Sequence, residues 1–147
     1  MLIKSEDETK KLAEKIVKLV KNNPTLICLN GPLGSGKTTF SRYFIRAYFS
    51  NLIEIEIPSP TFTLMQVYEY IGKCVYHYDF YRLNSSDELI EINFEENLLE
   101  GVSLVEWADK FENALPTNRI EIMFDIESKN QRKLKIKYLG DTKKFIK

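Results

Sequence analysis

The stretch GPLGSGKT, from Gly31 to Thr38, has the residue types and spacing of a phosphate-binding loop, GxxxxGK[ST]. Its glycines allow successive backbone N–H groups to surround an anion, and the helix that follows presents its positive end to the same anion. Lys37 would reach the outer phosphates, and the hydroxyl of Thr38 would ligate Mg²⁺. We therefore predict a nucleotide site at this loop.

The loop pattern does not identify the base, but two absences elsewhere in the sequence bear on it. The chain has no NKxD element, which guanine-specific GTPases usually carry, and no LSGGQ-like stretch of a transporter ATPase. These absences favour ATP as the nucleotide.

Two carboxylates are candidates for the metal and water chemistry that hydrolysis requires. Asp79 ends the run CVYHYD, and Glu106 ends the run VSLVE. A carboxylate at the end of a strand beside the loop can hold the water shell of Mg²⁺ or orient an attacking water. Since Glu106 follows the more apolar run, we predict that it binds the metal and that Asp79 assists it. The alternative for either residue is a carboxylate that only stabilises the fold or the surface.

The elements that must position these residues follow from hydrophobic periodicity. Ser5 and Glu8 form a capping box ahead of a helix that ends near Pro24, and residues 25–30 form a buried strand before the loop. A second helix is predicted from Lys37 to Phe49. The other expected elements are strands at 63–70, 74–81, 102–107, 119–127 and 132–139, an alternating stretch at 53–57, and short helices within 87–100 and 108–115.

This order predicts an α/β protein with the three-layer P-loop NTPase fold. A mixed central sheet would carry helices on both faces and end in a C-terminal β-hairpin, with residues 1–147 forming one domain. No apolar run reaches the roughly 20 residues that cross a membrane, and the N-terminus lacks the pattern of a signal peptide. We expect a cytoplasmic protein without membrane contact. Cys28 and Cys74 are expected to be buried, reduced thiols.

Charge is unevenly distributed along a chain whose formal net charge is zero. Residues 84–127 hold twelve acidic and two basic residues, a net of minus ten, whereas residues 128–147 hold eight basic and one acidic, a net of plus seven. The two segments are either compensating parts of a solvated surface or a means of docking on a charged protein or RNA partner.

Several separated motifs together resemble the bacterial TsaE (YjeE) family, the small P-loop ATPases needed to make threonylcarbamoyladenosine in tRNA. Besides GPLGSGKTTFSR, the chain has SPTFTL at 59–64, YHYDFYRL at 76–83, LVEW at 104–107 and LP at 115–116, in the order of the family. Each short motif alone is weak evidence for the family, but the full set with its spacing is specific to it.

The resemblance implies roles for particular residues. Thr38 and Glu106 would ligate Mg²⁺, and a loop containing Ser59, Pro60 and Thr61 would sense the γ-phosphate, unless it is a plain extended turn. The residues that would approach the nucleotide are Glu6, Leu33, Gly34, Ser35, Gly36, Lys37, Thr38, Thr39, Ser59, Thr61 and Asp109, and the catalytic set would be Lys37, Asp79 and Glu106.

Three further residues near these motifs have open roles. Arg82 would meet a phosphate or pair with an acidic residue of the next segment. Trp107, the one tryptophan, would be a core anchor or a lid over the nucleotide. His77 shares a strand face with Asp79, and the plain interpretation is a hydrogen-bonded core histidine without a catalytic role.

By the same resemblance, the chain would be an accessory ATPase. It would dock on the TsaB and TsaD proteins, which carry out threonylcarbamoyl transfer, and would contact tRNA indirectly or transiently. One alternative is a small nucleotide or metabolite kinase, although only Arg82, Arg119 and Arg132 follow the second helix and no basic lid segment is evident. Another is a nucleotide-gated binding module without turnover.

Overall fold

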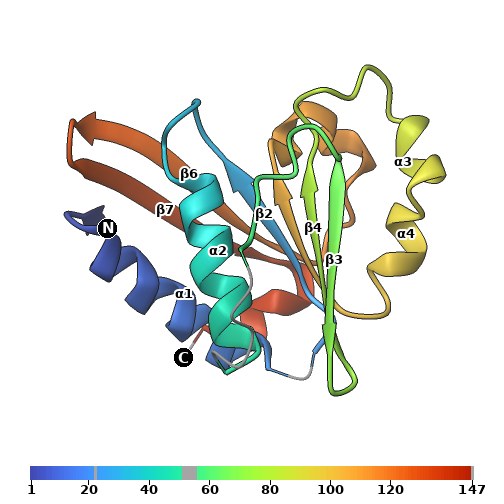
Figure 1. The fold of residues 1–147 in the computed structure, drawn as a ribbon, viewed down its shortest axis with the longest axis horizontal. Helices are drawn as coiled ribbons and strands as arrows, with labels where there is room; N and C mark the ends of the chain where they lie inside the picture. Colours follow the sequence, from blue (N-terminus) through green and yellow to red (C-terminus); the bar gives the residue numbers. More distant parts are fainter. Residues whose placement is uncertain (22, 51–55, 147) are drawn as a thin grey trace.

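A computed structural model describes residues 1–21, 23–50 and 56–146 of the chain. Strands form a seven-stranded mixed sheet in the order β1-β7-β6-β2-β5-β4-β3 (Figure 1). Its central strands β6, β2, β5 and β4 are parallel, and antiparallel strands flank them on both sides. The strands are β1 (Leu2–Ile3), β2 (Leu26–Asn30), β3 (Met65–Tyr70), β4 (Lys73–Asp79), β5 (Val102–Glu106), β6 (Arg119–Ser128) and β7 (Gln131–Leu139).

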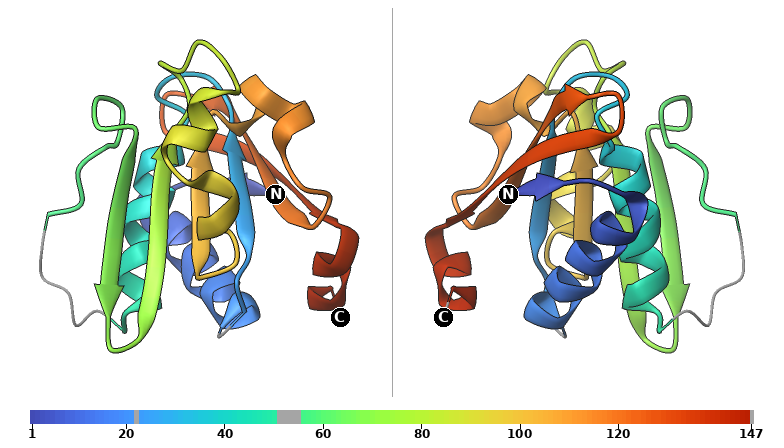
Figure 2. Two further views of the ribbon diagram at one scale, coloured as in Figure 1. Left: turned by 90° about the vertical axis from the view of Figure 1, so that its right-hand side faces the viewer. Right: turned by 90° about the vertical axis from the view of Figure 1, so that its left-hand side faces the viewer.

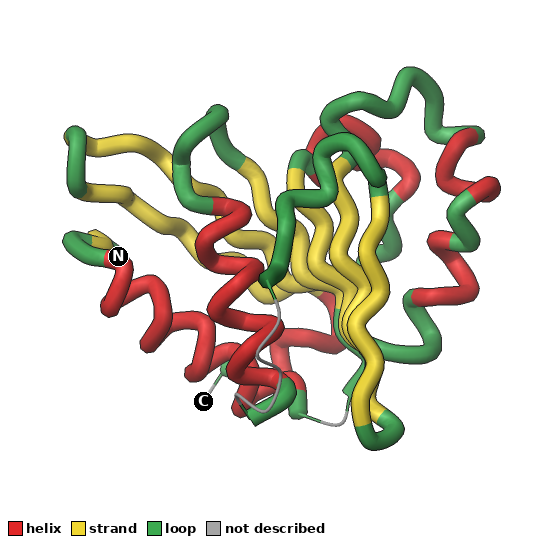
Figure 3. The backbone as a smooth tube through the Cα atoms, in the orientation of Figure 1, coloured by secondary structure: helices red, strands yellow, loops and turns green. Residues whose placement is uncertain are grey.

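Helices cover both faces of this sheet (Figures 2 and 3). On one face lie α1 (Glu6–Val20) and α2 (Lys37–Tyr48), which pack on Ile27, Leu29 and other sheet residues. On the other face α3 (Glu88–Glu91), α4 (Phe94–Asn97) and the 3-10 helix η1 (Ala108–Ala114) pack on Leu26 and Cys28. Side chains of alternate residues in the buried strand β2 therefore pack into two separate apolar cores, as expected for a parallel strand that is covered on both faces.

The parallel register brings the carboxyl ends of the central strands to one edge of the sheet. Asp79 of β4 lies opposite Glu106 of β5, and Leu29 of β2 lies opposite Glu106 on its other side. Since β2 leads directly into the glycine-rich loop and then α2, the loop is held beside both carboxylates. This edge is where α/β sheets place their ligands.

The predicted fold class is confirmed, with differences at several elements. β3 begins at Met65, later than expected, and β4 ends at Asp79 because the chain turns there. Two short elements were missed: β1, and a terminal 3-10 helix η2 (Gly140–Phe145). Too short for a periodic pattern, β1 is fixed by pairing with β7. Of the alternating stretch 53–57, residues 53–55 lie outside the described residues.

Two other sequence expectations can be compared with the structure. Both cysteines are free thiols; Cys28 is buried as predicted, but Cys74 near the start of β4 is partly exposed, so that expectation was wrong. Within the described ranges, no helix has both the length and the apolar character to cross a membrane.

Candidate nucleotide site

Glycines shape the loop between β2 and α2 in ways that a side chain would prevent. Gly31 has φ of 147°, and a Cβ there would come within 2.3 Å of the Phe124 carbonyl oxygen. Gly36 has φ of 110° and precedes α2 without offering a side-chain cap. The N–H groups of the first turn of α2 thus lack a capping acceptor from that residue, an arrangement suited to an anion.

The side chain of Lys37 lies inside the loop. Its ammonium donates hydrogen bonds to the carbonyl oxygens of Gly31 and Pro32, and it lies 4.1 Å from the centroid of the Trp107 ring. Burial lowers the pKa of Lys37 from its ordinary value, while the carboxylates of Glu106 and Asp79 act in the opposite direction. The cation is therefore held at the position where an anionic ligand would meet the loop.

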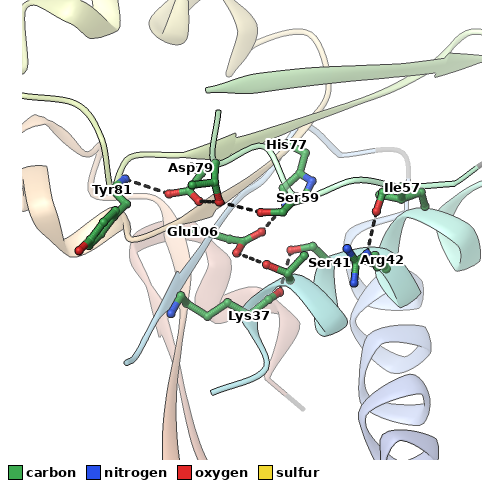
Figure 4. A network of polar contacts seen from close by, with 11 residues as sticks. Lys37, Ser41, Arg42, Ile57, Ser59, His77, Asp79, Tyr81 and Glu106 are labelled. Carbon is green, nitrogen blue, oxygen red and sulfur yellow. Dashed lines mark hydrogen bonds and ion pairs between the residues drawn. The ribbon is translucent and has the colours of Figure 1, made fainter. Parts of the chain in front are cut away.

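Glu106 is held between α2 and β4. Its Oε1 accepts a hydrogen bond of 2.6 Å from the Thr38 hydroxyl, and its Oε2 lies 2.6 Å from Nε2 of His77. Only 2% of Glu106 is exposed. The carboxylate is therefore bonded through both oxygens (Figure 4).

Asp79 organises a second set of contacts beside the first. Its Oδ2 accepts a hydrogen bond of 2.9 Å from the Thr61 hydroxyl, which is itself 2.8 Å from the Ser59 hydroxyl. Its Oδ1 accepts the backbone N–H of Tyr81 at 2.9 Å. Asp79 thus ties the Ser59–Thr61 loop to the end of β4, as Figure 4 shows.

An open cavity of about 670 Å³ lies over these groups. Among the sequence-predicted residues, those that line it come from the loop, the two carboxylates, the Ser59–Thr61 loop and the start of α1. They are Glu6, Leu33, Gly34, Ser35, Gly36, Lys37, Thr38, Thr39, Ser59, Thr61, Asp79 and Glu106. The fold thus gathers at one cavity residues that are up to a hundred positions apart in the sequence.

Asp109 and Arg82 are not among the residues that line this cavity. The backbone N–H of Asp109 donates to the Asn30 side chain at 3.0 Å, which ties η1 to the end of β2. Arg82 is exposed, with its guanidinium carbon 5.2 Å from the centroid of the Phe62 ring. Trp107, whose role was left open, does line the cavity.

Sequence reasoning missed cavity residues that come from the two ends of the chain. Lys4 and Thr9 lie near the start of α1, and Lys129 and Arg132 lie in the hairpin of β6 and β7. Arg132 donates to the Gly34 carbonyl oxygen at 3.2 Å. The one available signal was the basic composition of the hairpin, which does not reveal that β7 folds back beside the loop.

Comparison with known proteins identifies the family. The family model described as "Threonylcarbamoyl adenosine biosynthesis protein TsaE" matches residues 3–134. The chain belongs to the TsaE family. The TsaE protein of Rickettsia typhi is 38% identical over 92% of each chain, and that of Bacillus subtilis is 33% identical over 92% of this chain and 82% of its own. The crystal structure of Bacillus subtilis YdiB superimposes with a TM-score of 0.73 and 28% identity, covering 96% of this chain and 85% of that one.

All the predicted site residues fall within the range matched by the TsaE family model. The donor set at Thr38 and Glu106 fits Mg²⁺, because a hydroxyl and a carboxylate are hard oxygen ligands and their oxygens converge to 2.6 Å. Mg²⁺ usually takes few protein ligands and completes its coordination with water and substrate phosphates. The open cavity beside the pair leaves space for both.

Proposed function

We propose that this TsaE family chain is a Mg²⁺-dependent accessory ATPase for threonylcarbamoyl transfer to the adenosine beside the anticodon of tRNA. The observation that carries the proposal is the convergence of Lys37 and the Thr38–Glu106 pair on one open cavity at the end of the parallel sheet. The names of the relatives associate the pathway with the family, and the residues that line the cavity support the proposal that the chain uses ATP.

Each side chain has a distinct role in this proposal. The loop N–H groups and Lys37 bind the phosphates, and Thr38 and Glu106 hold Mg²⁺, which would neutralise charge on the phosphate oxygens. Asp79 is positioned to hold a water near the transferring phosphoryl group, directly or through Thr61. The first loop residues and the start of α1 enclose the remainder of the nucleotide.

The Ser59–Thr61 loop is suited to report the state of the nucleotide. Its hydroxyls bond to Asp79, and its approach is tied to α2 because Arg42 donates to the Ile57 carbonyl oxygen at 2.7 Å. A γ-phosphate in the cavity would compete for the same hydroxyls. Loss of that phosphate on hydrolysis would return them to Asp79, which is how switch loops in NTPases respond.

In this proposal the TsaB and TsaD proteins carry out the transfer, and the present chain docks on them in the cytoplasm. It would not itself perform the transfer, and it would contact tRNA indirectly or transiently. Two exposed apolar side chains are available to a protein partner: Leu33, which lines the cavity, is 86% exposed, and Phe62, which follows the cavity residue Thr61 in the chain, is 82% exposed.

The test compares Glu106→Gln and Asp79→Asn with the unchanged protein. ATP binding with and without Mg²⁺ is followed by Trp107 fluorescence and calorimetry, and turnover by phosphate release. Glu106→Gln should lose most of the Mg²⁺-dependent affinity while keeping the Mg²⁺-free affinity. Asp79→Asn should lower turnover more than binding.

Two results would contradict the proposal. If the ATP affinity of the unchanged protein were the same with and without Mg²⁺, Thr38 and Glu106 would have no role as metal ligands. Efficient transfer of the phosphoryl group to added nucleosides or metabolites, in place of phosphate release, would favour a kinase.

A further inference from the structure

His77 is the one histidine of the chain, and it is fully buried beside the Glu106 carboxylate. Its Nε2 lies 2.6 Å from Glu106 Oε2, while the other carboxylate oxygen accepts the Thr38 hydroxyl. His77 does not belong to the residues that line the cavity, whereas Glu106 does. The imidazole therefore lies behind Glu106, where it contacts the carboxylate but not a ligand in the cavity.

The fold determines this approach. His77 and Asp79 are two residues apart on β4 and so share one face of the sheet. In the parallel register His77 lies opposite Leu104, and Asp79 lies opposite Glu106. The imidazole reaches Glu106 diagonally, two residues forward along the neighbouring strand from Leu104, and closes off the buried side of the carboxylate.

The hydrogen bond also selects a tautomer. A carboxylate accepts hydrogen bonds and does not donate them, so Nε2 of His77 must carry the proton. Nδ1 is buried and has no hydrogen-bond partner among the described residues, so a proton there would be an unpaired donor. The geometry therefore favours the Nε2–H form.

We propose that His77 is a positioning residue that fixes the Glu106 carboxylate for Mg²⁺. With Oε2 held by the imidazole, Oε1 is directed toward Thr38 and the cavity. Without that bond the buried Oε2 would lose its donor, and the side chain could turn both oxygens away from the proposed metal position. This inference rests on the proposed Mg²⁺-dependent function.

The competing interpretation is that His77 only fills the core, and two substitutions separate the two ideas. His77→Gln can place an amide N–H near the position of Nε2, whereas His77→Leu has similar bulk and no donor. If His77 positions Glu106, Gln should preserve function better than Leu. If His77 only packs, Leu should be tolerated better, because Gln adds polar atoms to a buried site.

The first measurement is the apparent Mg²⁺ affinity in the presence of ATP, read by Trp107 fluorescence. Loss of a hydrogen bond that orients a metal ligand typically weakens metal affinity about 10- to 100-fold. His77→Leu should show a loss in this range with Mg²⁺-free ATP affinity nearly unchanged, and His77→Gln should recover most of it. Ser103→Ala, a change at a fully buried serine of β5, is the matched control and should leave Mg²⁺ affinity unchanged.

The second measurement does not depend on nucleotide or on the stability of the His77 variants. Because the chain has a single histidine, long-range ¹H–¹⁵N NMR reports one imidazole. We expect a proton at Nε2 that exchanges slowly with solvent, and a marked shift of its resonance in Glu106→Gln. A proton at Nδ1, or an Nε2 resonance that does not shift in Glu106→Gln, would overturn the proposal.

Failure of this inference is distinguishable from failure of the proposed function. Equal Mg²⁺ affinity in His77→Leu and the unchanged protein would reject the positioning role while leaving the ATPase intact. Absence of ATP binding in the unchanged protein would reject the proposed function, and with it the metal role of His77, even where NMR shows the bond to Glu106.

Discussion

At the scale of single residues, Lys37 shows how the candidate nucleotide site is arranged. Its ammonium is bonded to the carbonyl oxygens of Gly31 and Pro32 and lies over the Trp107 ring. These acceptors are weaker partners than ionised phosphate oxygens, because charge-assisted hydrogen bonds between ions are the stronger ones. Arriving phosphates would therefore draw the ammonium away from the loop carbonyls.

Lys37→Ala is expected to weaken ATP binding severely while the sheet still folds. Hydrogen bonds to charged groups contribute about 1.5 to 3 kcal/mol each, so losing one corresponds to roughly a 10- to 100-fold drop in affinity. Calorimetric titration with ATP and Mg²⁺ measures the change, and circular dichroism checks the fold. Lys15→Ala, which removes an exposed lysine of α1, is the control and should bind like the unchanged protein. Unchanged affinity in Lys37→Ala would refute the phosphate-binding role of the loop.

At the scale of elements, the sequence predicted those parts whose local patterns are strong. The capping box predicted for α1 is formed in part, since the Ser5 hydroxyl accepts the Glu8 N–H at 3.3 Å, but the Glu8 carboxylate accepts the backbone N–H of Lys4 at 2.7 Å instead of that of Ser5. The apolar run of β2 is buried throughout, as a strand covered on both faces must be. Both short acidic helices, α3 and α4, also lie within the predicted range 87–100.

Other features depend on contacts between distant segments, which local periodicity cannot contain. β1 exists only by pairing with β7, about 130 residues later. Arg132 donates to the Gly34 carbonyl oxygen of the loop because β7 lies beside it. The backbone N–H of Asp109 donates to the Asn30 side chain. Asp79 and Glu106 were predictable as strand ends, but their neighbouring register and the bond from His77 required the assembled sheet.

The attachment of α4 to β4 gives a prediction about alkaline stability. Tyr78 of β4 is fully buried, accepts a hydrogen bond of 2.9 Å from Asn97, and has its pKa raised by burial to about 12. An unfolded tyrosine ionises near pH 10, so between about pH 10 and 12 the folded protein keeps a proton that the unfolded chain releases. The free energy of unfolding should therefore fall by about 1.4 kcal/mol per pH unit from this residue, an effect absent below pH 10.

Tyr78→Phe should reduce the fall in the free energy of unfolding per pH unit between about pH 10 and 12. Urea unfolding at a series of pH values between 9 and 12 measures it, with Tyr70→Phe, at a partly exposed tyrosine of β3, as the control. A slope identical in all three proteins would show that Tyr78 keeps an ordinary pKa in the folded state.

At the scale of the whole molecule, the acidic segment 84–127 is divided between two parts of the fold, because its helices lie apart from the basic segment while its last strand, β6, pairs with β7. The acidic helices α3 and α4 cover one face beside β4, whereas the basic hairpin of β6 and β7 lies toward the opposite end of the sheet (Figure 1). On β7 the exposed residues Lys133, Lys135 and Lys137 alternate with Leu134, which is buried in the core with α1. The lysines therefore point away from α1, on a face of the hairpin where Lys133 and Lys137 lie opposite Asp125 and Glu121 of β6.

The final prediction concerns activation of ATP turnover by partners. Fast hydrolysis requires a cation at the transferring phosphoryl group, an effect worth about 10³ to 10⁵ in rate in GTPases. In this structure Arg82 does not line the cavity, and the guanidinium of Arg132 donates to the carbonyl oxygens of Ser128, Gln131 and Gly34. Of the other cations that line it besides Lys37, Lys4 precedes α1 and Lys129 lies at the turn of the β6–β7 hairpin, and we expect neither to act at the transferring phosphoryl group. The isolated protein should therefore hydrolyse ATP slowly, and addition of the TsaB and TsaD proteins should raise the rate.

Charge on the docking face can be tested within the same assay. If the basic hairpin docks, changing Lys133, Lys135 and Lys137 to Glu should reduce the stimulation of ATP turnover by the partners. The matched change of Glu91, Glu95 and Glu96 to Lys should then leave the stimulation unchanged. The reverse result would assign docking to the acidic helices. Raised salt should weaken stimulation in either case, because exposed charges are screened beyond about 8 Å at physiological ionic strength. Rapid turnover by the isolated chain, or turnover that does not respond to the partners, would defeat the accessory-ATPase proposal, since the cation would then already be in place or the partners would not supply it.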